Sequence, residues 1–244
     1  NGISLYGGLF PFGGTFLVFS DYVRSAIRLS AIQKLHVMYE FTHDSIFVGE
    51  DGPTHQPVEH TMSLRLIPGL LVFRPSDAIE THFCFEAIME NENNPSAILL
   101  TRQKLPVSII DKNIIRNGVK KGAYAALESN DPDAVIFTTG SELHLALAIA
   151  EEINHNIKIV NIPCWELFEQ QSEGYKNDIL TNSCKKRISI EAGITLGWEK
   201  FVGQDGLKIG VDNFGLSAPG TDVAQHFNFT KENIRNKIEE YLSE

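Results

Sequence analysis

The sequence predicts an α/β protein with two domains, each a mostly parallel sheet flanked by helices. Three observations lead to this prediction. Short apolar runs alternate with longer stretches of helical periodicity, which is typical of βαβ units. The 244 residues are enough for two domains of ordinary size. The composition, 43% hydrophobic and 21% charged, is that of a globular protein with a sizeable core.

Seven short apolar runs are expected to form strands. They are Val37–Phe41, Leu70–Phe73, Ala97–Thr101, Ala134–Thr139, Lys158–Ile162, Arg187–Glu191 and Lys208–Val211. Because helical patterns separate these runs, most neighbouring strands are expected to be parallel.

Four stretches between the runs carry helix signals. They are Ser20–Leu35, Asp77–Glu90, Ser141–Ile153 and Thr230–Leu242. The second opens with Asp77 and has Glu80 three residues later, which is a capping-box pattern. The other three place apolar side chains three and four residues apart, as one face of a helix requires.

The boundary between the two domains is expected near Pro106–Gly118. This stretch follows a strand, shows no helical periodicity and precedes a second series of βαβ patterns. Residues 1–106 and 115–244 are therefore expected to form the two domains.

Charge and composition exclude several classes of protein. The net charge is −10 and no basic stripe appears, so we expect no general nucleic-acid binding. No apolar run reaches the roughly 18 residues of a membrane span, so we expect no membrane-spanning segment, and we expect no signal peptide. The cysteines Cys84, Cys164 and Cys184 are odd in number and form no CxxC pair, which favours free thiols in the reducing cytoplasm.

Residues 41–60 hold an unusual concentration of polar groups between apolar ones. The histidines and acids are His43, His55, His60, Asp44, Glu50, Asp51 and Glu59. Burying so many polar groups in a core element would cost too much solvation free energy. The interleaved apolar residues argue against disorder. We therefore expect a structured loop on which proton-carrying groups converge.

Three chemistries are open to this loop. A proton relay that contacts substrate hydroxyls is favoured, because neutral histidines exchange protons near pH 7. A metal set of His43, His55 and Asp51 is less favoured. His55 and His60 are five residues apart, a spacing that does not place two ligands on one face of a helix. No cysteine lies near these histidines to complete a metal site. A triad using Ser45 lacks a nucleophile elbow. His60 itself is expected to be structural or at the surface.

The segment before the first helix combines paired glycines with aromatic residues. Phe16, Phe19 and Tyr22 recur at intervals of three residues. Spacing alone favours a buried stripe, and the alternative is a platform on which a flat heterocycle stacks. The dinucleotide-binding and P-loop glycine motifs are both absent.

Arg74 and Arg102 each follow a predicted strand. At the carboxyl edge of a parallel sheet, arginine can hold a phosphate or carboxylate in bidentate fashion. For Arg74 and for Arg102, a surface ion pair explains the position as well as ligand binding does. Residues 138–142 form a strand-to-helix turn whose N–H groups can bind an anion, although helix capping alone also explains this turn.

Together the motifs resemble those of the transketolase family, which depends on thiamine diphosphate. The matching phrases are FTHDS, GEDGPTHQPVEH, RPSD, LLTRQ, TTGSE, IEAG and FGLSAP. They extend over essentially the whole chain. The phrase GEDGPTHQP is highly specific, since related thiamine-diphosphate enzymes share only a looser version of it.

The resemblance implies that residues 1–106 are the later part of a pyrimidine-binding domain. Residues 115–244 would be the C-terminal domain, whose catalytic part is not established. The resemblance also implies that Phe16, Phe19 and Tyr22 bind the cofactor, with Phe19 stacked on the aminopyrimidine ring. This raises the platform interpretation above the buried stripe.

A substrate channel is implied as well. By the resemblance, His43 and Arg102 hold the sugar phosphate, and Asp51 contacts the C2 hydroxyl of the donor. His55 is the expected catalytic residue, which assists proton transfer and contacts donor hydroxyls.

The implied activity transfers a two-carbon ketol unit between ketose and aldose phosphates of the pentose phosphate pathway. It requires thiamine diphosphate and Mg²⁺ or another divalent cation. This segment is expected to hold no metal ligands. They are expected on the N-terminal diphosphate-binding domain, which the partner subunit of a homodimer supplies.

The family's essential glutamate lies a few residues before a phrase that ends in Ala-Asn-Gly, whereas this chain starts at Asn1. We therefore expect a fragment that is inactive alone. One alternative is a C-terminal subunit of a split transketolase. Another is a non-catalytic regulatory or binding remnant, although such a remnant would not need all four channel residues.

Overall fold

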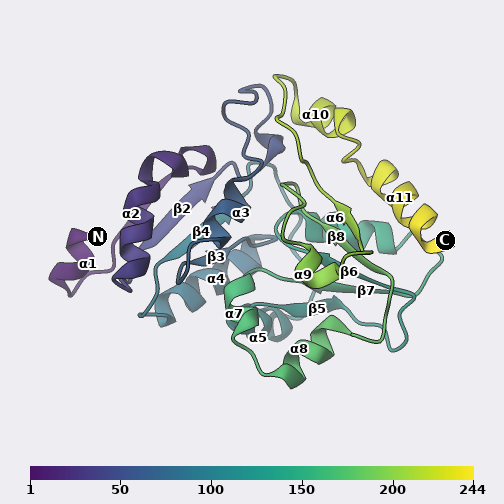
Figure 1. Cartoon of the computed structure of the whole chain (residues 1–244), viewed down its shortest axis with the longest axis horizontal. Helices are drawn as coiled ribbons and strands as arrows, with labels where there is room; N and C mark the ends of the chain where they lie inside the picture. Colours follow the sequence, from purple (N-terminus) through teal and green to yellow (C-terminus); the bar gives the residue numbers. More distant parts are fainter.

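Two separate sheets organise the computed structural model, which describes residues 1–244 (Figure 1). The first sheet has the order β1-β2-β4-β3 and is parallel throughout. Its strands are β1 (Phe12–Phe16), β2 (Met38–Thr42), β3 (Leu71–Phe73) and β4 (Ser96–Leu100).

The second sheet has the order β5-β7-β6-β8-β9, and only β5 is antiparallel to its neighbour. Its strands are β5 (Tyr124–Leu127), β6 (Ala134–Thr138), β7 (Ile157–Asn161), β8 (Arg187–Ile190) and β9 (Leu207–Ile209). The predicted fold class is confirmed. The seven predicted strands are all present, with ends that differ by at most two residues.

Helices connect and cover the strands of both sheets. Around the first sheet they are α1 (Gly2–Tyr6), η1 (Leu17–Phe19), α2 (Ser20–Ile32), η2 (Ile46–Val48), α3 (His60–Arg65) and α4 (Ala78–Glu90). Around the second they are α5 (Lys112–Lys121), α6 (Glu142–Ala150), α7 (Trp165–Glu169), α8 (Glu173–Leu180), α9 (Glu199–Val202), α10 (Gly220–His226) and α11 (Lys231–Ser243). None of these helices combines the length and the apolar character that crossing a bilayer requires.

The start of α4 has the Asp77 cap that its sequence predicts, whereas the Glu80 side chain bonds one residue earlier than a capping box requires. The Asp77 carboxylate accepts a hydrogen bond from the Glu80 N–H at 2.8 Å, and the Glu80 carboxylate accepts one from the Ser76 N–H at 2.6 Å. The Glu80 N–H, which the first helical turn leaves unpaired, is thereby satisfied, and the Glu80 side chain fixes Ser76, one residue before the N-cap Asp77.

The two halves of the chain share a buried apolar cluster. It joins Leu71 and Ile98 of the first sheet to Ile115 and Val119 of α5 and to Cys164. Helix α5 packs against α4, and α7 packs against β3. All three cysteines are free and buried.

Beyond the four helices and seven strands that were predicted, the structure has further elements, among them α5, β1 and β5. Helix α5 (Lys112–Lys121) overlaps the stretch Pro106–Gly118 that was expected to lack helical periodicity, so that expectation was wrong. Its buried positions are Ile115, Gly118 and Val119, and glycine is required because a Cβ at Gly118 would overlap Tyr124. Strand β1 is an exposed, Gly-containing edge strand, and β5 reads Tyr-Ala-Ala-Leu with two alanines, which are depleted in strands, so neither has a strong strand signal.

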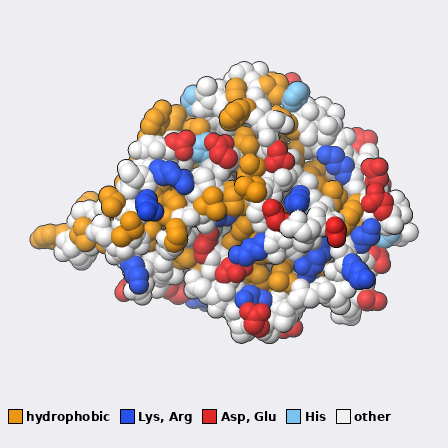
Figure 2. Space-filling model, in the orientation of Figure 1, with side chains coloured by type: hydrophobic (Ala, Val, Ile, Leu, Met, Phe, Trp, Pro, Cys, Tyr) orange, Lys and Arg blue, Asp and Glu red, His pale blue; other side chains and the backbone are white.

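Charged side chains of both signs are interspersed on the face shown in Figure 2. Lys and Arg do not form a continuous basic stripe on this face. That distribution agrees with the excess of acids over bases in the sequence.

Candidate active site

The candidate site begins at the carboxyl edge of the first sheet. The last residues of β1, β2 and β4 are in register, since Phe16 pairs with Thr42 and Thr42 with Leu100. The segments that follow these strands therefore leave the sheet at one level. They carry Phe19, His43 and Arg102 to the same edge, which is where ligands bind in open parallel sheets.

The three aromatic residues form a stacked series. The rings of Phe16 and Phe19 lie 6.2 Å apart at 15°, and those of Phe19 and Tyr22 lie 5.8 Å apart at 21°. None of the three is buried, and Tyr22 is 83% exposed. A buried stripe is therefore excluded, whereas open aromatic faces are what a stacking platform requires.

The histidines of the loop lie against this aromatic series. The His43 ring stacks on Phe16 at 3.8 Å and 20°, and the His55 ring meets Phe19 edge-on at 5.5 Å and 82°. The sequence presents the aromatic segment and the histidine loop as two separate motifs. The fold makes them one site.

His43 is held in an uncommon conformation. Its φ is 61°, in the left-handed region that non-glycine residues rarely adopt, and its Nδ1 lies 2.9 Å from the Thr42 Oγ1. Burial lowers the pKa of His43, and the nearby positive charge of Arg102 lowers it further, while Asp51 and Asp44 oppose the shift. The imidazole is therefore neutral at pH 7 and can accept a proton or donate a hydrogen bond.

The remaining channel residues lie around this centre. His55 is half-buried, with its Nδ1 2.9 Å from the Thr54 Oγ1. Asp51 and Arg102 are exposed. Both act electrostatically on His43, so the four residues His43, Asp51, His55 and Arg102 are brought together.

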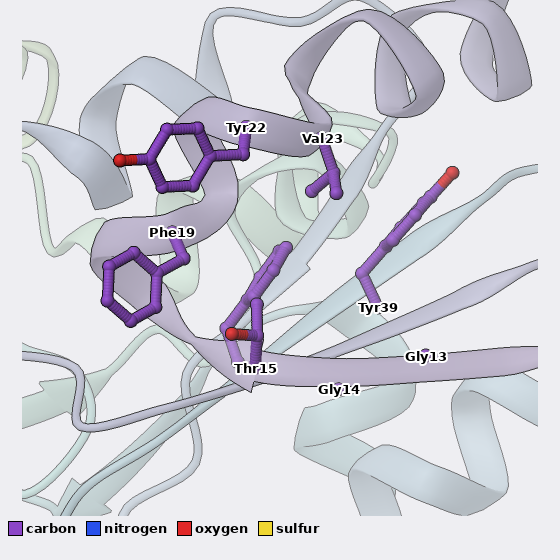
Figure 3. Close-up of a pocket in the computed structure, with 8 residues that line it drawn as sticks. Gly13, Gly14, Thr15, Phe19, Tyr22, Val23 and Tyr39 are labelled. Atoms are coloured by element: carbon purple, nitrogen blue, oxygen red, sulfur yellow. The ribbon is translucent and has the colours of Figure 1, made fainter.

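A cavity of about 570 Å³ adjoins the platform (Figure 3). It is lined by Gly13, Gly14, Thr15, Phe19, Tyr22, Val23, Tyr39 and Phe41. Figure 3 shows the rings of Phe19 and Tyr22 on one side and Val23 and Tyr39 on the other. Apolar walls with glycines at the base suit a flat heterocycle. Sequence reasoning missed Tyr39 and Phe41, because alternation in β2 marks them only as core residues.

Arg74 does not hold a ligand, contrary to one interpretation of its sequence position. It is 1% exposed, so a surface ion pair is excluded too. Its Nε donates to the Asp44 carboxylate at 2.8 Å, and its Nη1 pairs with Glu142 and lies 3.5 Å from Glu191. These three carboxylates outweigh burial and raise the pKa of Arg74 further.

The turn at residues 138–142 is part of the same cluster. The Glu142 carboxylate and the Arg74 guanidinium fill the turn, and Arg74 also donates to the Thr139 carbonyl at 3.2 Å. The Gly140 N–H donates to the Arg74 carbonyl at 2.9 Å and the Leu143 N–H to the Gly140 carbonyl at 3.2 Å, so these two donors are not free to bind an anion. The side chain of Ser141 does not cap α6 either, so simple capping is also not observed.

His60 was expected to be either structural or at the surface, and it is structural. Its side chain is buried, with Nε2 3.3 Å from the Asp21 carboxylate and Nδ1 3.7 Å from Glu59. No group of three or more His, Cys, Asp or Glu side chains is arranged to hold a metal ion.

Comparisons with known proteins give a consistent picture. Residues 1–108 match the family described as transketolase, pyrimidine binding domain, and residues 122–230 match the transketolase-like C-terminal domain. The transketolase of Staphylococcus aureus (strain MW2) is 46% identical over 242 residues, which are 98% of this chain and 37% of that protein. The chain thus spans little more than a third of this relative.

Solved structures agree. A transketolase from Leishmania mexicana superposes with a TM-score of 0.94 at 37% identity, over all of this chain and 36% of that one. A structure titled split gene transketolase, inactive beta4 tetramer, superposes with a TM-score of 0.81 over 99% of this chain and 79% of that one. Its identity is 20%, so it shows the fold alone.

Proposed function

We propose that this chain, which belongs to the transketolase family as its pyrimidine-binding and C-terminal parts, forms part of a thiamine-diphosphate-dependent transferase. The enzyme would move a two-carbon ketol unit between ketose and aldose phosphates. The convergence of the stacked aromatic rings with His43 and His55 at one sheet edge carries this proposal. It joins a surface for a flat ring to groups that handle protons.

The cavity fits the aminopyrimidine ring of thiamine diphosphate. Phe19 would stack on this ring, and Phe16 and Tyr22 would complete the aromatic surface. The cofactor, when bound, supplies carbanion stabilisation during carbon–carbon cleavage. The contribution of this chain is to orient the ring and exclude water from one face of it.

The four channel residues would bind and orient the sugar phosphates. Arg102, exposed beside His43, would pair with the phosphate, and His43 would donate a hydrogen bond to it. Asp51 would accept a hydrogen bond from the donor C2 hydroxyl. His55, held by Thr54, would transfer protons to and from substrate oxygens.

A partner is required to complete this site. Metal ligands for Mg²⁺ or another divalent cation, and the glutamate that protonates the aminopyrimidine, would come from the N-terminal diphosphate-binding part of the enzyme. In a homodimer this part would approach the open platform from the second subunit. The excess of acidic residues in the sequence and the three free thiols support a cytoplasmic location.

Two forms of the enzyme are compatible with this chain. In one, residues 1–244 are a segment of a longer polypeptide. In the other, they are a separate subunit that works only with an N-terminal partner. The chain superposes both on a longer transketolase and on a split-gene transketolase, so the fold fits either form. A binding remnant is disfavoured, because it would have no need to keep the four channel residues together.

The test is a reconstitution assay with xylulose 5-phosphate and ribose 5-phosphate, in the presence of thiamine diphosphate and magnesium. We expect no turnover from the 244-residue chain and turnover from the complete enzyme, with the cofactor-free mixture as control. Turnover by the pure chain would contradict the assignment of the absent groups to a partner. A folded complete enzyme that binds thiamine diphosphate but transfers no ketol unit would contradict the function itself.

A further inference from the structure

We propose that the C-terminal half of the chain positions the substrate residues of the N-terminal half, and that Gln56 is the positioning residue through which it acts. The inference rests on the proposed function, because that function places Asp51 and His55 in the substrate site. It concerns residues 49–58, here termed the substrate loop. The substrate loop contains no helix or strand, and its turns are held by three backbone hydrogen bonds of its own together with contacts to the rest of the fold.

Gln56 closes the base of the substrate loop. Its side chain is 2% exposed, and its Nε2 donates hydrogen bonds to the Gly49 carbonyl at 2.7 Å and to the Leu216 carbonyl at 3.0 Å. The first bond joins the two ends of the loop, and the second joins the loop to the C-terminal half. Asp51 and His55 lie between the two joined residues, so this amide group fixes the stretch that carries them, together with the loop's own backbone hydrogen bonds from Gly52 to Gly49 and from His55 to Gly52.

Residues 214–219 pack closely against the substrate loop, with no room for an added Cβ atom at two glycines. A Cβ atom at Gly215 would overlap the Gln56 Oε1, and one at Gly52 would overlap the Ser217 Oγ. Gly52 also has a φ of +78°, which favours glycine. Figure 1 shows the connection between β2 and α3 beside the segment that leads into α10. Small movements of residues 214–219 must therefore move the loop.

The far end of the loop is held separately. The Val58 carbonyl accepts a hydrogen bond from the Ile194 N–H at 3.1 Å, and a Cβ at Gly193 would approach this carbonyl to 3.3 Å. Ile194 directly follows the IEAG phrase. The loop is thus attached to the C-terminal half at both flanks.

The other substrate histidine is held by the same half. Asp44 follows His43 and is bonded to Arg74, which is surrounded by Glu142 and Glu191. Glu191 is fixed in turn by Arg65 at 2.9 Å. Glu142 of TTGSE and Glu191 of IEAG thus reach Asp44 through Arg74, and Leu216 of FGLSAP accepts directly from Gln56. None of the three phrases lines the cofactor cavity.

Simple adhesion between the two halves is the competing explanation. The structure offers a second contact between the halves that can distinguish adhesion from positioning of the loop. Asn161 Nδ2 donates to the Glu80 carboxylate across the halves at 2.7 Å and to the Tyr124 hydroxyl at 3.2 Å. Neither partner belongs to the substrate loop, so loss of this contact weakens adhesion without touching the loop.

The first experiment compares Gly215→Ala with Gly174→Ala in the complete enzyme. We expect Gly215→Ala to lower kcat/KM for the donor sugar by about tenfold to a hundredfold, with KM for thiamine diphosphate unchanged, because small misplacement of reacting groups has effects of that size. At Gly174 a Cβ would meet only the Ser172 Oγ at 4.0 Å, so this control should keep wild-type kinetics. Wild-type donor kinetics in Gly215→Ala, with or without a lower melting temperature, would overturn the inference.

The second experiment needs no activity. It compares Gln56→Met with Asn161→Leu by amide hydrogen exchange of the complete enzyme. We expect exchange in residues 50–55 to rise about tenfold or more in Gln56→Met only, because the loop loses its closing bonds. Unchanged exchange in those residues, or an equal rise in both variants, would contradict positioning. If the wild-type enzyme transfers no ketol unit, the proposed function fails, while this exchange result still decides whether the loop is held as described.

Discussion

The two arginines that follow strands β3 and β4 meet opposite environments. Arg74 is fully buried among Asp44, Glu142 and Glu191, whereas Arg102 is exposed beside His43. Both follow a parallel strand, and both occupy positions from which arginine can hold an anionic ligand. The second sheet brings two carboxylates against Arg74 and leaves Arg102 open. An arginine at a strand end is therefore assigned to structure or to binding by what the rest of the fold places against it.

Replacing each arginine by methionine tests this contrast most strongly. Arg74→Met should lower the free energy of unfolding of the chain by about 3–5 kcal/mol, because it leaves buried carboxylates without their cation. Arg102→Met should change it by less than about 0.5 kcal/mol, since exposed substitutions rarely do more. Urea denaturation followed by circular dichroism measures both. Equal losses in the two variants would remove the distinction.

The buried contact between the halves at Glu80 should make stability depend on pH. Burial raises the pKa of Glu80 to about 7 from its ordinary 4.5, so the folded state keeps a proton that the unfolded state releases. Glu80 therefore stabilises the fold most below pH 4.5, and this contribution is lost as pH rises to about 7. The loss is on the order of 3 kcal/mol.

Glu80→Gln should abolish that part of the pH dependence. The glutamine amide can be accommodated, because the Asn161 Oδ1 has no partner and can turn to accept from it. We expect the variant to be more stable than the wild type at pH 8 and similar to it at pH 4. Denaturation midpoints measured across this range check the sign, and parallel pH profiles for the two proteins would show that Glu80 is not the titrating group.

The exposed arginine should matter for substrate and not for folding. In the complete enzyme, Arg102→Ala should raise KM for phosphorylated sugars about tenfold to a hundredfold, because a charge-assisted contact is worth about 1.5–3 kcal/mol. Unphosphorylated substrates should be nearly unaffected. Steady-state kinetics on both substrate types give the ratio, and an equal loss on both would indicate a structural role.

The smallest expected effect concerns the aromatic platform. Phe19→Ala should weaken thiamine-diphosphate binding in the complete enzyme by about 0.5–1.5 kcal/mol beyond the lost apolar contact, and Phe19→Trp should weaken it less. Because Phe19 is not buried, the melting temperature of the apo protein should hardly change. Calorimetric titration and thermal melting on the same variants separate the two readouts. A large drop in apo stability with normal cofactor affinity would exclude the platform.

Local signals determined most of the secondary structure. Runs of four to six apolar residues marked seven strands, and Asp77 with Glu80 marked the start of α4, because these signals act within one turn or one strand. The signals failed where packing overrides propensity. Helix α5 has a glycine that only Tyr124 explains, and β1 becomes a strand because β2 offers it an edge.

For the candidate site, too, the sequence identified the residues, whereas the tertiary structure decided their contacts. Residue types and motifs were enough to single out Phe16, Phe19, Tyr22 and the four channel residues, whose roles stay predictions. Only the tertiary structure decided that the Phe16 ring stacks on His43, that Arg74 is enclosed by carboxylates, and that Gln56 reaches Leu216. These contacts join residues 27 to 160 positions apart or lie between the two sheets. No local pattern specifies such contacts, because they exist only once both sheets have packed.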